Sequence, residues 1–411
     1  MTVTVVAIFA IVYVGMILGG LPFLQLDRTG VALLGAIALV AIGELTPEQA
    51  AQSIHLPTLL LLFSFMVISA QMRLGGFYGW VTQHIAALRL PPAALLAMVI
   101  SVTAALSAVF SNDIVCLAVA PVLAEACLRR GLDPVPFLLA LACAANIGSA
   151  ATLIGNPQNM LLGQVLRLPF GAYFLEAIVP VLLGLATLWV ILAWQSRGRW
   201  RAPLPPTASG RAGDTPLDRW QTAKGLTVAV ALIAAFLFSG LPRDVAALTG
   251  AGLLLMSRRL HSANTLGLVD WELLILFIGL FVVNHALERT GVTAEVVRWL
   301  AAQGFALSEP GPLFAATLAL SNVVSNVPAV MLLLPAATKP FSGPMLALVS
   351  TLAGNLLIVG SIANIIVVDA ARRQGIAIDW RRHLRTGLPV TLATLAITAA
   401  WFGWRAGVMV F

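Results

Sequence analysis

The chain has 411 residues, of which 60% are hydrophobic and 10% are charged, and its formal net charge is +7. A soluble protein of this length would carry about 25% charged residues, so the composition excludes a soluble globular fold and favours the lipid bilayer as the solvent for most side chains. The net charge would suit a nucleic-acid-binding protein, but the arginines lie in short loops between apolar segments and form no basic face. We therefore expect no nucleic-acid partner.

The first apolar segment begins at the start of the chain. No basic residue precedes it and no convincing small-residue cleavage site follows it, so we expect residues 1–20 to form a retained transmembrane helix rather than a signal peptide. Segments long enough to cross, or nearly to cross, a bilayer then follow in order. In the first half they are about 3–21, 29–43, 56–72, 134–168 and 172–195.

A polar linker follows at residues 196–221. Its prolines and arginines predict an irregular segment; they are Pro203, Pro205, Pro206, Pro216, Arg197, Arg199, Arg201, Arg211 and Arg219. The pattern of apolar segments then recurs. In the second half the segments are about 222–240, 244–258, 271–287, 341–371 and 384–406.

Each half also contains an extra apolar stretch with a polar centre, at about 92–128 and 310–338. Each arm of the second stretch has about 12–14 residues, which is too short to span about 30 Å of hydrocarbon at 1.5 Å per residue. We therefore predict a re-entrant hairpin at 310–338. The arms at 92–128 are longer, and a hairpin is predicted there by symmetry with the second half.

The two halves resemble each other in sequence. Residues 111–121 align without gaps on 325–335, and the segment GNPQN at 155–159 aligns on GSIAN at 360–364. A nearly constant offset of about 205–215 residues across four segments predicts two internal repeats, 1–195 and 222–411. Five crossings per repeat is an odd number, so the second repeat must be inverted. The predicted fold is an all-α polytopic membrane protein with two inverted repeats, each containing five transmembrane helices, one of them broken, and one re-entrant hairpin.

The distribution of positive charge predicts the orientation in the membrane. If the linker at 196–221 is cytoplasmic, 18 of the 24 lysines and arginines fall on the cytoplasmic side, Arg130 and Arg219 among them, whereas Arg289 and Arg298 fall outside. This bias favours ten crossings of the bacterial inner membrane, with both termini in the periplasm. The hairpin at 92–128 then opens to the cytoplasm, and the hairpin at 310–338 opens to the outside.

Four polar clusters lie at membrane depth. Gly, Pro, Asn and Ser interrupt helices there, which lipid tolerates only where protein or a water-filled cavity satisfies the freed backbone groups. The candidate binding residues of the first half are Ser111, Asn112, Asp113, Asn146, Gly148, Ser149, Thr152, Gly155, Asn156 and Asn159. Those of the second half are Asn322, Ser325, Asn326, Asn355, Ser361 and Asn364.

These clusters predict a site for an anion and a cation together. Asn156 before Pro157 is typical of a helix N-cap followed by proline at the first helical position, and we expect Asn326 and Ser361 to act as caps as well. Several half-helix N-termini facing one cavity attract an anion without any lysine or arginine. The amide, hydroxyl and carbonyl oxygens suit Na⁺, which we place at Ser111, Asn112 and Asp113 and at Ser325 and Asn326.

The alternative is a purely structural role, in which the Asn and Ser residues of these clusters only cap helices or form hydrogen bonds between packed helices. Asp113, the carboxylate at a hairpin tip, is a functional candidate because of its depth in the membrane, and a structural helix cap is the alternative role.

Three cysteines and five histidines lie scattered, without the spacing of a metal site or a nucleophile–base pair. We therefore expect no enzyme activity and no cofactor, with Na⁺ or H⁺ as the coupling ion.

The motifs SAVFSNDIVCLAVAP (107–121) and ANIGSAATLIGNPQNMLLG (145–163) resemble the citrate-transporter-like domain of the ion transporter superfamily. That group includes arsenite permeases and D-type sodium–proton antiporters, and the paired Ser-Asn tips are also similar to those of the divalent anion–sodium symporters. The resemblance covers essentially the whole chain. It implies a scaffold and a transport domain, an elevator-like movement and a homodimer. The symporters carry Thr as the third residue of the Ser-Asn tip motif, whereas this chain has Asp113 and Val327 there. At the first broken helix, some relatives carry Gly-Asp-Pro-Pro-Asn where this chain has GNPQN, with Asn156 in place of the aspartate.

These observations predict a secondary transporter that moves a small anion, a carboxylate or an inorganic oxyanion, with Na⁺ or H⁺. An arsenite or antimonite efflux permease is the first alternative, since such a substrate is uncharged near neutral pH and needs no fixed positive charge. A sodium–proton antiporter is a further alternative, made less favourable by the few carboxylates of the site. A channel or a membrane-embedded enzyme would belong to a different class.

Overall fold

The prediction of an all-helical membrane protein is confirmed. The computed structural model describes residues 2–21, 24–201 and 216–408. These residues form helices joined by short connections, apart from one antiparallel pair of two-residue strands, β1 (Gly20–Leu21) and β2 (Leu26–Asp27). Within them, α4, α6, α10, α11, α14 and α20 are long and apolar enough to cross a membrane, and several shorter apolar helices accompany these.

The helices of the first half follow the predicted segments and add two short ones. They are α1 (Thr2–Leu18), α2 (Arg28–Ala41), α3 (Pro47–Ser53), α4 (Leu56–Leu74), α5 (Phe77–Ala87), α6 (Pro92–Val109), α7 (Asn112–Arg129), α8 (Pro134–Ser149), α9 (Pro157–Val165) and α10 (Phe170–Gln195).

The second half presents helices in the same order. They are α11 (Arg219–Phe238), α12 (Arg243–Leu255), α13 (Ser262–Leu266), α14 (Trp271–Arg289), α15 (Val292–Ala302), α16 (Pro310–Val324), α17 (Asn326–Leu333), the 3₁₀ turns η1 (Leu334–Ala336) and η2 (Ile358–Gly360), α18 (Ser342–Ala353), α19 (Ile362–Arg373) and α20 (Trp380–Val408).

Short helices that the apolar pattern does not predict also recur in both halves. The helices α3 and α13 follow the second long helix of their half, and α5 and α15, of 11 residues each, follow the third. This order is what two repeats require. The inversion of the second repeat across a membrane stays a prediction.

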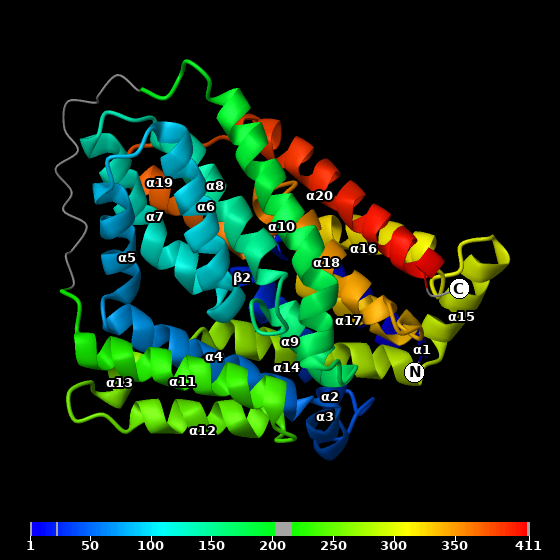
Figure 1. Ribbon diagram of the computed structural model, residues 1–411. Helices are drawn as coiled ribbons and strands as arrows, with labels where there is room; N and C mark the ends of the chain where they lie inside the picture. The colour runs from blue at the N-terminus through cyan, green and yellow to red at the C-terminus, as the bar shows by residue number, and fades with distance from the viewer. Residues whose placement is uncertain (1, 22–23, 202–215, 409–411) are drawn as a thin grey trace.

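The helices pack in two groups. The platform helices are α1, α2, α4, α11, α12 and α14, and the central helices are α6–α10 and α16–α20. Figure 1 shows α4, α11 and α12 side by side along one edge of the molecule, with the central helices crossing above them. The helices α5 and α15 lie at opposite edges and lead from one group to the other. Each starts at a glycine with positive φ, Gly76 (72°) and Gly291 (77°), a conformation that glycine adopts without steric cost and that turns the chain sharply.

The predicted boundary of the linker is wrong at its C-terminal end. Residues 219–221 are helical because α11 begins at Arg219, where the Asp218 side chain accepts hydrogen bonds from the N–H groups of Trp220 and Gln221. An aspartate at this position is a strong N-cap and stabilises the helix start. Residues 202–215, which hold most of the predicted irregular segment, lie outside the described residues.

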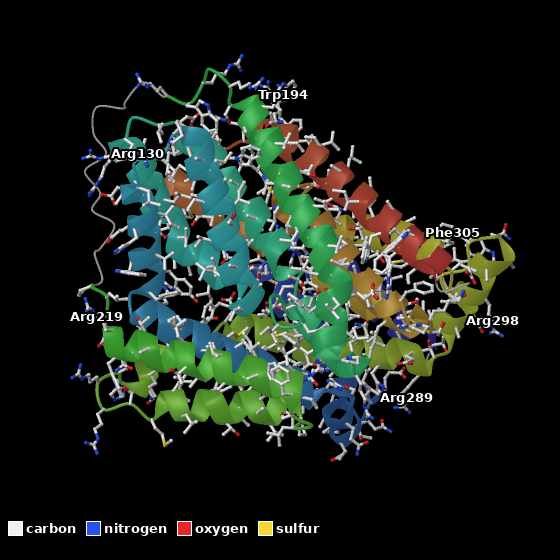
Figure 2. All side chains as sticks on the ribbon, in the orientation of Figure 1. Arg130, Trp194, Arg219, Arg289, Arg298 and Phe305 are labelled. Carbon is white, nitrogen blue, oxygen red and sulfur yellow. The ribbon has the colours of Figure 1, made fainter. Side chains whose placement is uncertain are left out.

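The first and the last described helix, α1 and α20, reach the same side of the molecule. In Figure 1 the start of α1 and the end of α20 lie at the edge away from the residues that flank the linker. Figure 2 shows Arg130 and Arg219, both predicted to be cytoplasmic, at one edge, whereas Arg289 and Arg298, both predicted to be external, lie at the other. The two sets of charges therefore occupy opposite ends of the molecule, as two sides of a membrane would require.

Close packing of α6 against α8 gives a prediction about stability. A Cβ atom added to Gly148 would lie 2.4 Å from the Cα of Ala104, a backbone atom that cannot rotate away. We expect Gly148→Ala to lower the free energy of unfolding by about 1–3 kcal/mol, because overpacking forces backbone shifts. Thermal melting in detergent measures the loss. Gly252→Ala is the matched control, since nothing lies within 4 Å of the added atom, and equal melting of both variants would contradict the prediction.

Candidate binding site at the broken helices

Two helices of the central group are broken, and each break is closed by an asparagine side chain. In the first half, Nδ2 of Asn159 donates to the carbonyl oxygens of Thr152 (3.0 Å) and Ser149 (3.5 Å). In the second half, Nδ2 of Asn364 donates to the carbonyl oxygens of Leu357 (3.0 Å) and Gly354 (2.8 Å). Both asparagines thus reach carbonyls seven and ten residues earlier, which satisfies backbone groups that the interrupted helix leaves free.

The two breaks face each other and exchange hydrogen bonds. Nδ2 of Asn156 donates to Oγ1 of Thr351 at 3.2 Å, and Oγ of Ser361 donates to Oδ1 of Asn146 at 2.9 Å. Ser361 occupies the position of Asn156 in the repeat, and Thr351 that of Asn146. Contacts that repeat with the partners exchanged are the mark of a two-fold relation. The geometry of the two breaks therefore fits the repeat alignment, residue by residue.

Asn146 is the hub of the polar network. Its Oδ1 accepts from Nδ2 of Asn112 (3.3 Å) and from Oγ of Ser361 (2.9 Å). Its Nδ2 donates to Oδ1 of Asn355 (2.9 Å) and to Oδ1 of Asn364 (3.2 Å). The side chain is 2% exposed. Asn146 thus joins the first break, to which it belongs, with the first hairpin and the second break. Because every partner is uncharged, these connections involve no ion pair.

The hairpin tips meet these breaks. At the first tip, the backbone N–H of Asn112 donates to the carbonyl oxygen of Gly155 at 3.3 Å. At the second tip, Nδ2 of Asn326 lies so close to Gly354 that a Cβ atom added there would be 3.1 Å from it. Asn322 lies beside Gly360 in the same way, at 3.5 Å. The N-termini of α7, α9, α17 and α19 are therefore brought to one region, two from each half.

Four amide oxygens in this region have no hydrogen-bond partner among the described residues. They are Oδ1 of Asn112, Asn159, Asn322 and Asn326, and all four are buried. Those of Asn112, Asn322 and Asn326 lie at or next to the hairpin tips. A buried acceptor without a partner is costly, and native proteins rarely keep one without a ligand, ion or water. Amide oxygens are ligands that hard cations prefer. The donor set at both tips thus fits Na⁺ chemically.

The second tip carries a strained residue. Ser325 has φ 78° and ψ 162°, a region that is essentially restricted to glycine. Its counterpart Ser111 has φ −55° and an ordinary conformation. Such a residue persists only where its surroundings hold it, and strained residues of this kind cluster at binding sites. The two tips are therefore similar in sequence but differ in backbone geometry.

The predicted N-cap at Asn156 is confirmed, whereas that at Asn326 is wrong. Oδ1 of Asn156 accepts from the backbone N–H of Asn159, and Pro157 is the first residue of α9. Asn326 is itself the first residue of α17, and Ser325 holds the cap position without a side-chain hydrogen bond. Ser361 is the N-cap residue of α19, but its hydroxyl bonds to Asn146 instead of to the helix.

Several predicted residues support the site from its edges. Thr152 donates through Oγ1 to the carbonyl oxygen of Ala108 at 2.5 Å, and Oγ of Ser149 donates to the carbonyl of Asn146. The glycines at 148 and 155 allow close backbone approach, since a Cβ atom at Gly155 would lie 2.3 Å from the carbonyl oxygen of Ser149. These residues shape the first break.

Ser111 and Asp113 are not part of the hydrogen-bonded network. The backbone N–H of Ser111 donates to Oγ of Ser69 at 3.3 Å. Asp113 lies in the first turn of α7 and is half-buried, and within the described residues its carboxylate makes no hydrogen bond or ion pair. The predicted Na⁺ set of Ser111, Asn112 and Asp113 is thus adjacent in sequence, but only Asn112 reaches Asn146.

Other polar residues of the region were not predicted. Thr351 accepts from Asn156 and from Nε2 of Gln158, and it could have been found as the repeat counterpart of Asn146. The hydroxyl of Tyr173 accepts from Asn159 (3.1 Å) and donates to the carbonyl oxygen of Ala150 (2.7 Å). Nothing in the local sequence marks Tyr173 or Ser69.

Comparison with known proteins places this arrangement among transporters. A family model described as "Citrate transporter" matches residues 11–351. The silicon efflux transporter LSI3 of Oryza sativa subsp. japonica is 29% identical, over 95% of this chain and 95% of that protein. An uncharacterised transporter of Mycobacterium tuberculosis is 28% identical, over 93% and 94%. The crystal structure of the YdaH transporter of Alcanivorax borkumensis superposes with a TM-score of 0.61 at 15% identity, covering 99% of this chain and 98% of that one, which is a likeness of fold.

Proposed function

The chain belongs to the citrate transporter family, and on that premise we propose that it is a secondary carrier of a small anion, a carboxylate or an inorganic oxyanion, coupled to Na⁺ or H⁺. The observation that carries the proposal is the convergence of four half-helix N-termini, two from each half, on the Asn146 network. Helix N-termini present backbone N–H groups and partial positive charge to an anion.

We also propose a binding site for the coupling cation at the hairpin tips. The buried amide oxygens of Asn112, Asn322 and Asn326 lack partners among the described residues and would serve as Na⁺ ligands. A cation held at the tips would also offset the negative charge of a substrate beside it. Binding of one would then favour binding of the other, which is the energetic basis of symport.

The packing supports an elevator-type movement as part of the proposal. The site residues belong to the central helices, and α5 and α15 connect these to the platform helices through glycines in the left-handed conformation. We propose that the central helices move as a body against the platform helices, with the site carried along. We further propose that the carrier is a homodimer.

The proposed location gives a testable topology. We propose that the protein lies in the bacterial inner membrane with both termini in the periplasm and the 205–215 segment in the cytoplasm. Alkaline phosphatase fused to the C-terminus is then expected to be active, and green fluorescent protein at the same place is expected to be dark. The same reporters within 205–215 are expected to give the reverse. A fluorescent fusion at the C-terminus would contradict the ten-crossing arrangement.

The substrate proposal is tested by binding and then by mutation. Purified protein is melted in the presence of citrate, succinate, sulfate, phosphate and arsenite, each with Na⁺ or K⁺. A ligand present at 100 times its dissociation constant adds about 2.7 kcal/mol of stability, so the true substrate raises the melting temperature measurably. We expect an anion to be most effective, and to be more effective with Na⁺ if that ion is the coupling ion.

Variants at the two hairpin tips test whether the stabilising ligand binds there. Asn112→Ala and Asn326→Ala remove amide oxygens that have no partner among the described residues, and Asn112→Ala also removes one hydrogen bond to Asn146. Each variant is expected to fold while losing the ligand-induced stabilisation and the transport of that ligand. Proteoliposome uptake of the stabilising anion measures the second effect. If both variants bind and transport like the parent, the tips serve only as helix caps and the site lies elsewhere.

An uncharged oxygen acid is the second candidate substrate, as in an arsenite or antimonite efflux permease. Two observations favour it: the hydrogen-bond network around Asn146 contains only uncharged groups, and a relative that matches over nearly the whole chain is a silicon efflux transporter. Arsenite uptake into proteoliposomes discriminates the two. Stabilisation by arsenite alone, with uptake insensitive to an imposed membrane potential, would replace the anion proposal by this one.

A further inference from the structure

A separate charged region lies away from the broken helices, where α5 faces α7. A cavity of about 640 Å³ opens there, lined by residues of α5, of α7 and of the end of α4. Three arginines and one glutamate line it, namely Arg73, Arg129, Arg130 and Glu125, so the wall carries a net positive charge. Its volume lies in the range of small-molecule sites.

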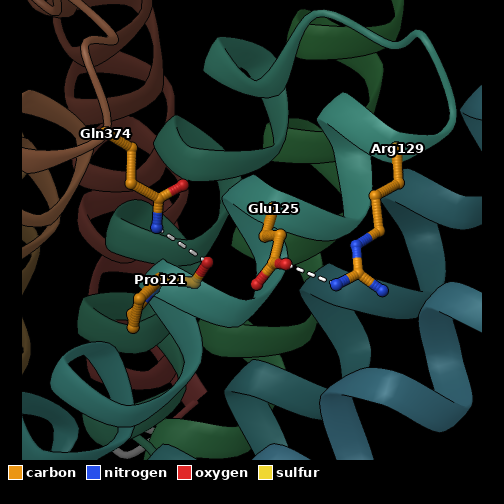
Figure 3. A network of polar contacts seen from close by, with 4 residues as sticks. All are labelled: Pro121, Glu125, Arg129 and Gln374. Atoms are coloured by element: carbon orange, nitrogen blue, oxygen red, sulfur yellow. Dashed lines mark hydrogen bonds and ion pairs between the residues drawn. The ribbon is translucent and has the colours of Figure 1, made fainter. Parts of the chain in front are cut away.

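Two of the three arginines are held by neighbours. Arg129 forms an ion pair with Glu125 at 2.5 Å, one turn earlier on α7, as Figure 3 shows. The Arg130 guanidinium donates at 3.1 Å to three backbone carbonyls at the end of α5 and in the loop after it, which fixes its position. Figure 3 also shows Gln374, directly after the end of α19, donating to the carbonyl of Pro121, so this wall is tied to the second half of the chain.

Arg73 is different, because no side chain that the structure describes is paired with it. Within the described residues it takes part in no ion pair and no hydrogen bond, yet it is half-buried at the end of α4. A guanidinium in this position keeps five donors that carboxylates and oxyanions match well. Partial burial also reduces the screening of its charge by water.

The inner part of the cavity wall lies against the first hairpin tip. Tyr78 lines the cavity, is 1% exposed and stacks edge-on against Phe110, with ring centroids 5.9 Å apart. Phe110 directly precedes the tip residue Ser111. The Tyr78 hydroxyl is buried and lies near Ser69 of α4. The half-buried cation Arg73 and the ring of Tyr78 therefore line one cavity that adjoins the tip.

We propose that this cavity is an anion-selective vestibule for small carboxylates or oxyanions, with Arg73 as the residue that attracts them. It lies on the side that the charge distribution predicts to be cytoplasmic, so it would load or release substrate there. The inference rests on the proposed function for its purpose, but its test measures only electrostatics and accessibility. The two can therefore fail separately.

The test is charge-selective modification of a cysteine in the vestibule. The three native cysteines, all buried, are replaced by alanine, and Ala118→Cys places one thiol in the cavity wall. Rates are measured with an anionic sulfonatoethyl and a cationic trimethylammonioethyl methanethiosulfonate, each relative to free cysteine. We expect the anionic reagent to be favoured in the parent, and Arg73→Gln to lower the anionic-to-cationic rate ratio about fivefold, as removal of one nearby unit charge implies.

Two controls keep the result specific. Arg73→Lys is expected to retain the preference, since it keeps the charge. Ala301→Cys, exposed on α15 at the opposite edge, is expected to show the same ratio with and without Arg73→Gln. A thiol at position 118 that reacts with neither reagent would show that the cavity is closed to water and overturn the proposal. So would an unchanged ratio in Arg73→Gln.

Discussion

Asn146→Ala is expected to lower the transport rate on the order of 100-fold, because the change removes four hydrogen bonds at once and leaves buried partners unsatisfied. The partners come from the first hairpin and from the second break. The substitution therefore separates the two halves at the point where the proposed site is assembled. Initial uptake of the stabilising anion in proteoliposomes, at matched protein content, measures the effect.

Two comparisons make the Asn146 result interpretable. Asn264→Ala removes an exposed asparagine on α13 and is expected to leave uptake unchanged. Asn146→Ser keeps one hydroxyl donor and acceptor and is expected to retain a single folded species by size-exclusion chromatography, with reduced uptake. If Asn146→Ala is folded and transports at the parent rate, the network is structural and the proposed site is wrong.

Asp113→Asn is expected to weaken the apparent Na⁺ affinity about tenfold or more while leaving the pH dependence of transport intact, since it removes one charge without changing the shape of the side chain. Asp113 lies in the first turn of α7, where no side chain caps the helix. Its carboxylate has no partner among the described residues, so the capping alternative has no hydrogen bond to support it. A bound cation would supply the missing partner.

Stabilisation by Na⁺ measures this without knowledge of the substrate. The melting temperature is followed against NaCl with choline chloride keeping ionic strength constant, for the parent and for Asp113→Asn. Asp369→Asn is the matched control, because Asp369 is exposed and already paired with Arg373. Equal Na⁺ dependence in the parent and Asp113→Asn would exclude Asp113 from the cation site. If Asp113→Asn instead loses only the pH dependence of transport, Asp113 is the proton carrier.

The sequence predicted best what local chemistry determines. Asn156 followed by Pro157 identified the start of α9, since both the capping side chain and the proline act on neighbouring backbone. The same reasoning failed at Asn326, because Pro328 lies at the third helical position and the chain enters the helix through the strained Ser325. A positive φ at a non-glycine residue has no reliable signal in a single sequence.

Adjacency in the sequence did not predict which side chains of the first tip join the Asn146 network. Asn112 and Asp113 are consecutive on α7, so their side chains point about 100° apart and cannot both face Asn146. Tyr173 enters the site from α10 and Ser69 from α4, through tertiary contacts that no local pattern encodes. Thr351, in contrast, could have been predicted, because the repeat alignment pairs it with Asn146.

Coupled accumulation is the most direct test of a carrier built around the Asn146 network. Proteoliposomes holding the parent protein or Asn146→Ala are diluted into the radiolabelled stabilising anion, with an inward gradient of Na⁺ or H⁺ or with none. We expect one gradient to drive transient accumulation of the anion above its equilibrium level in the parent, and we expect Asn146→Ala to abolish this accumulation. Uptake that rises only to equilibrium under every gradient, or that persists in Asn146→Ala, would contradict a coupled carrier with this site.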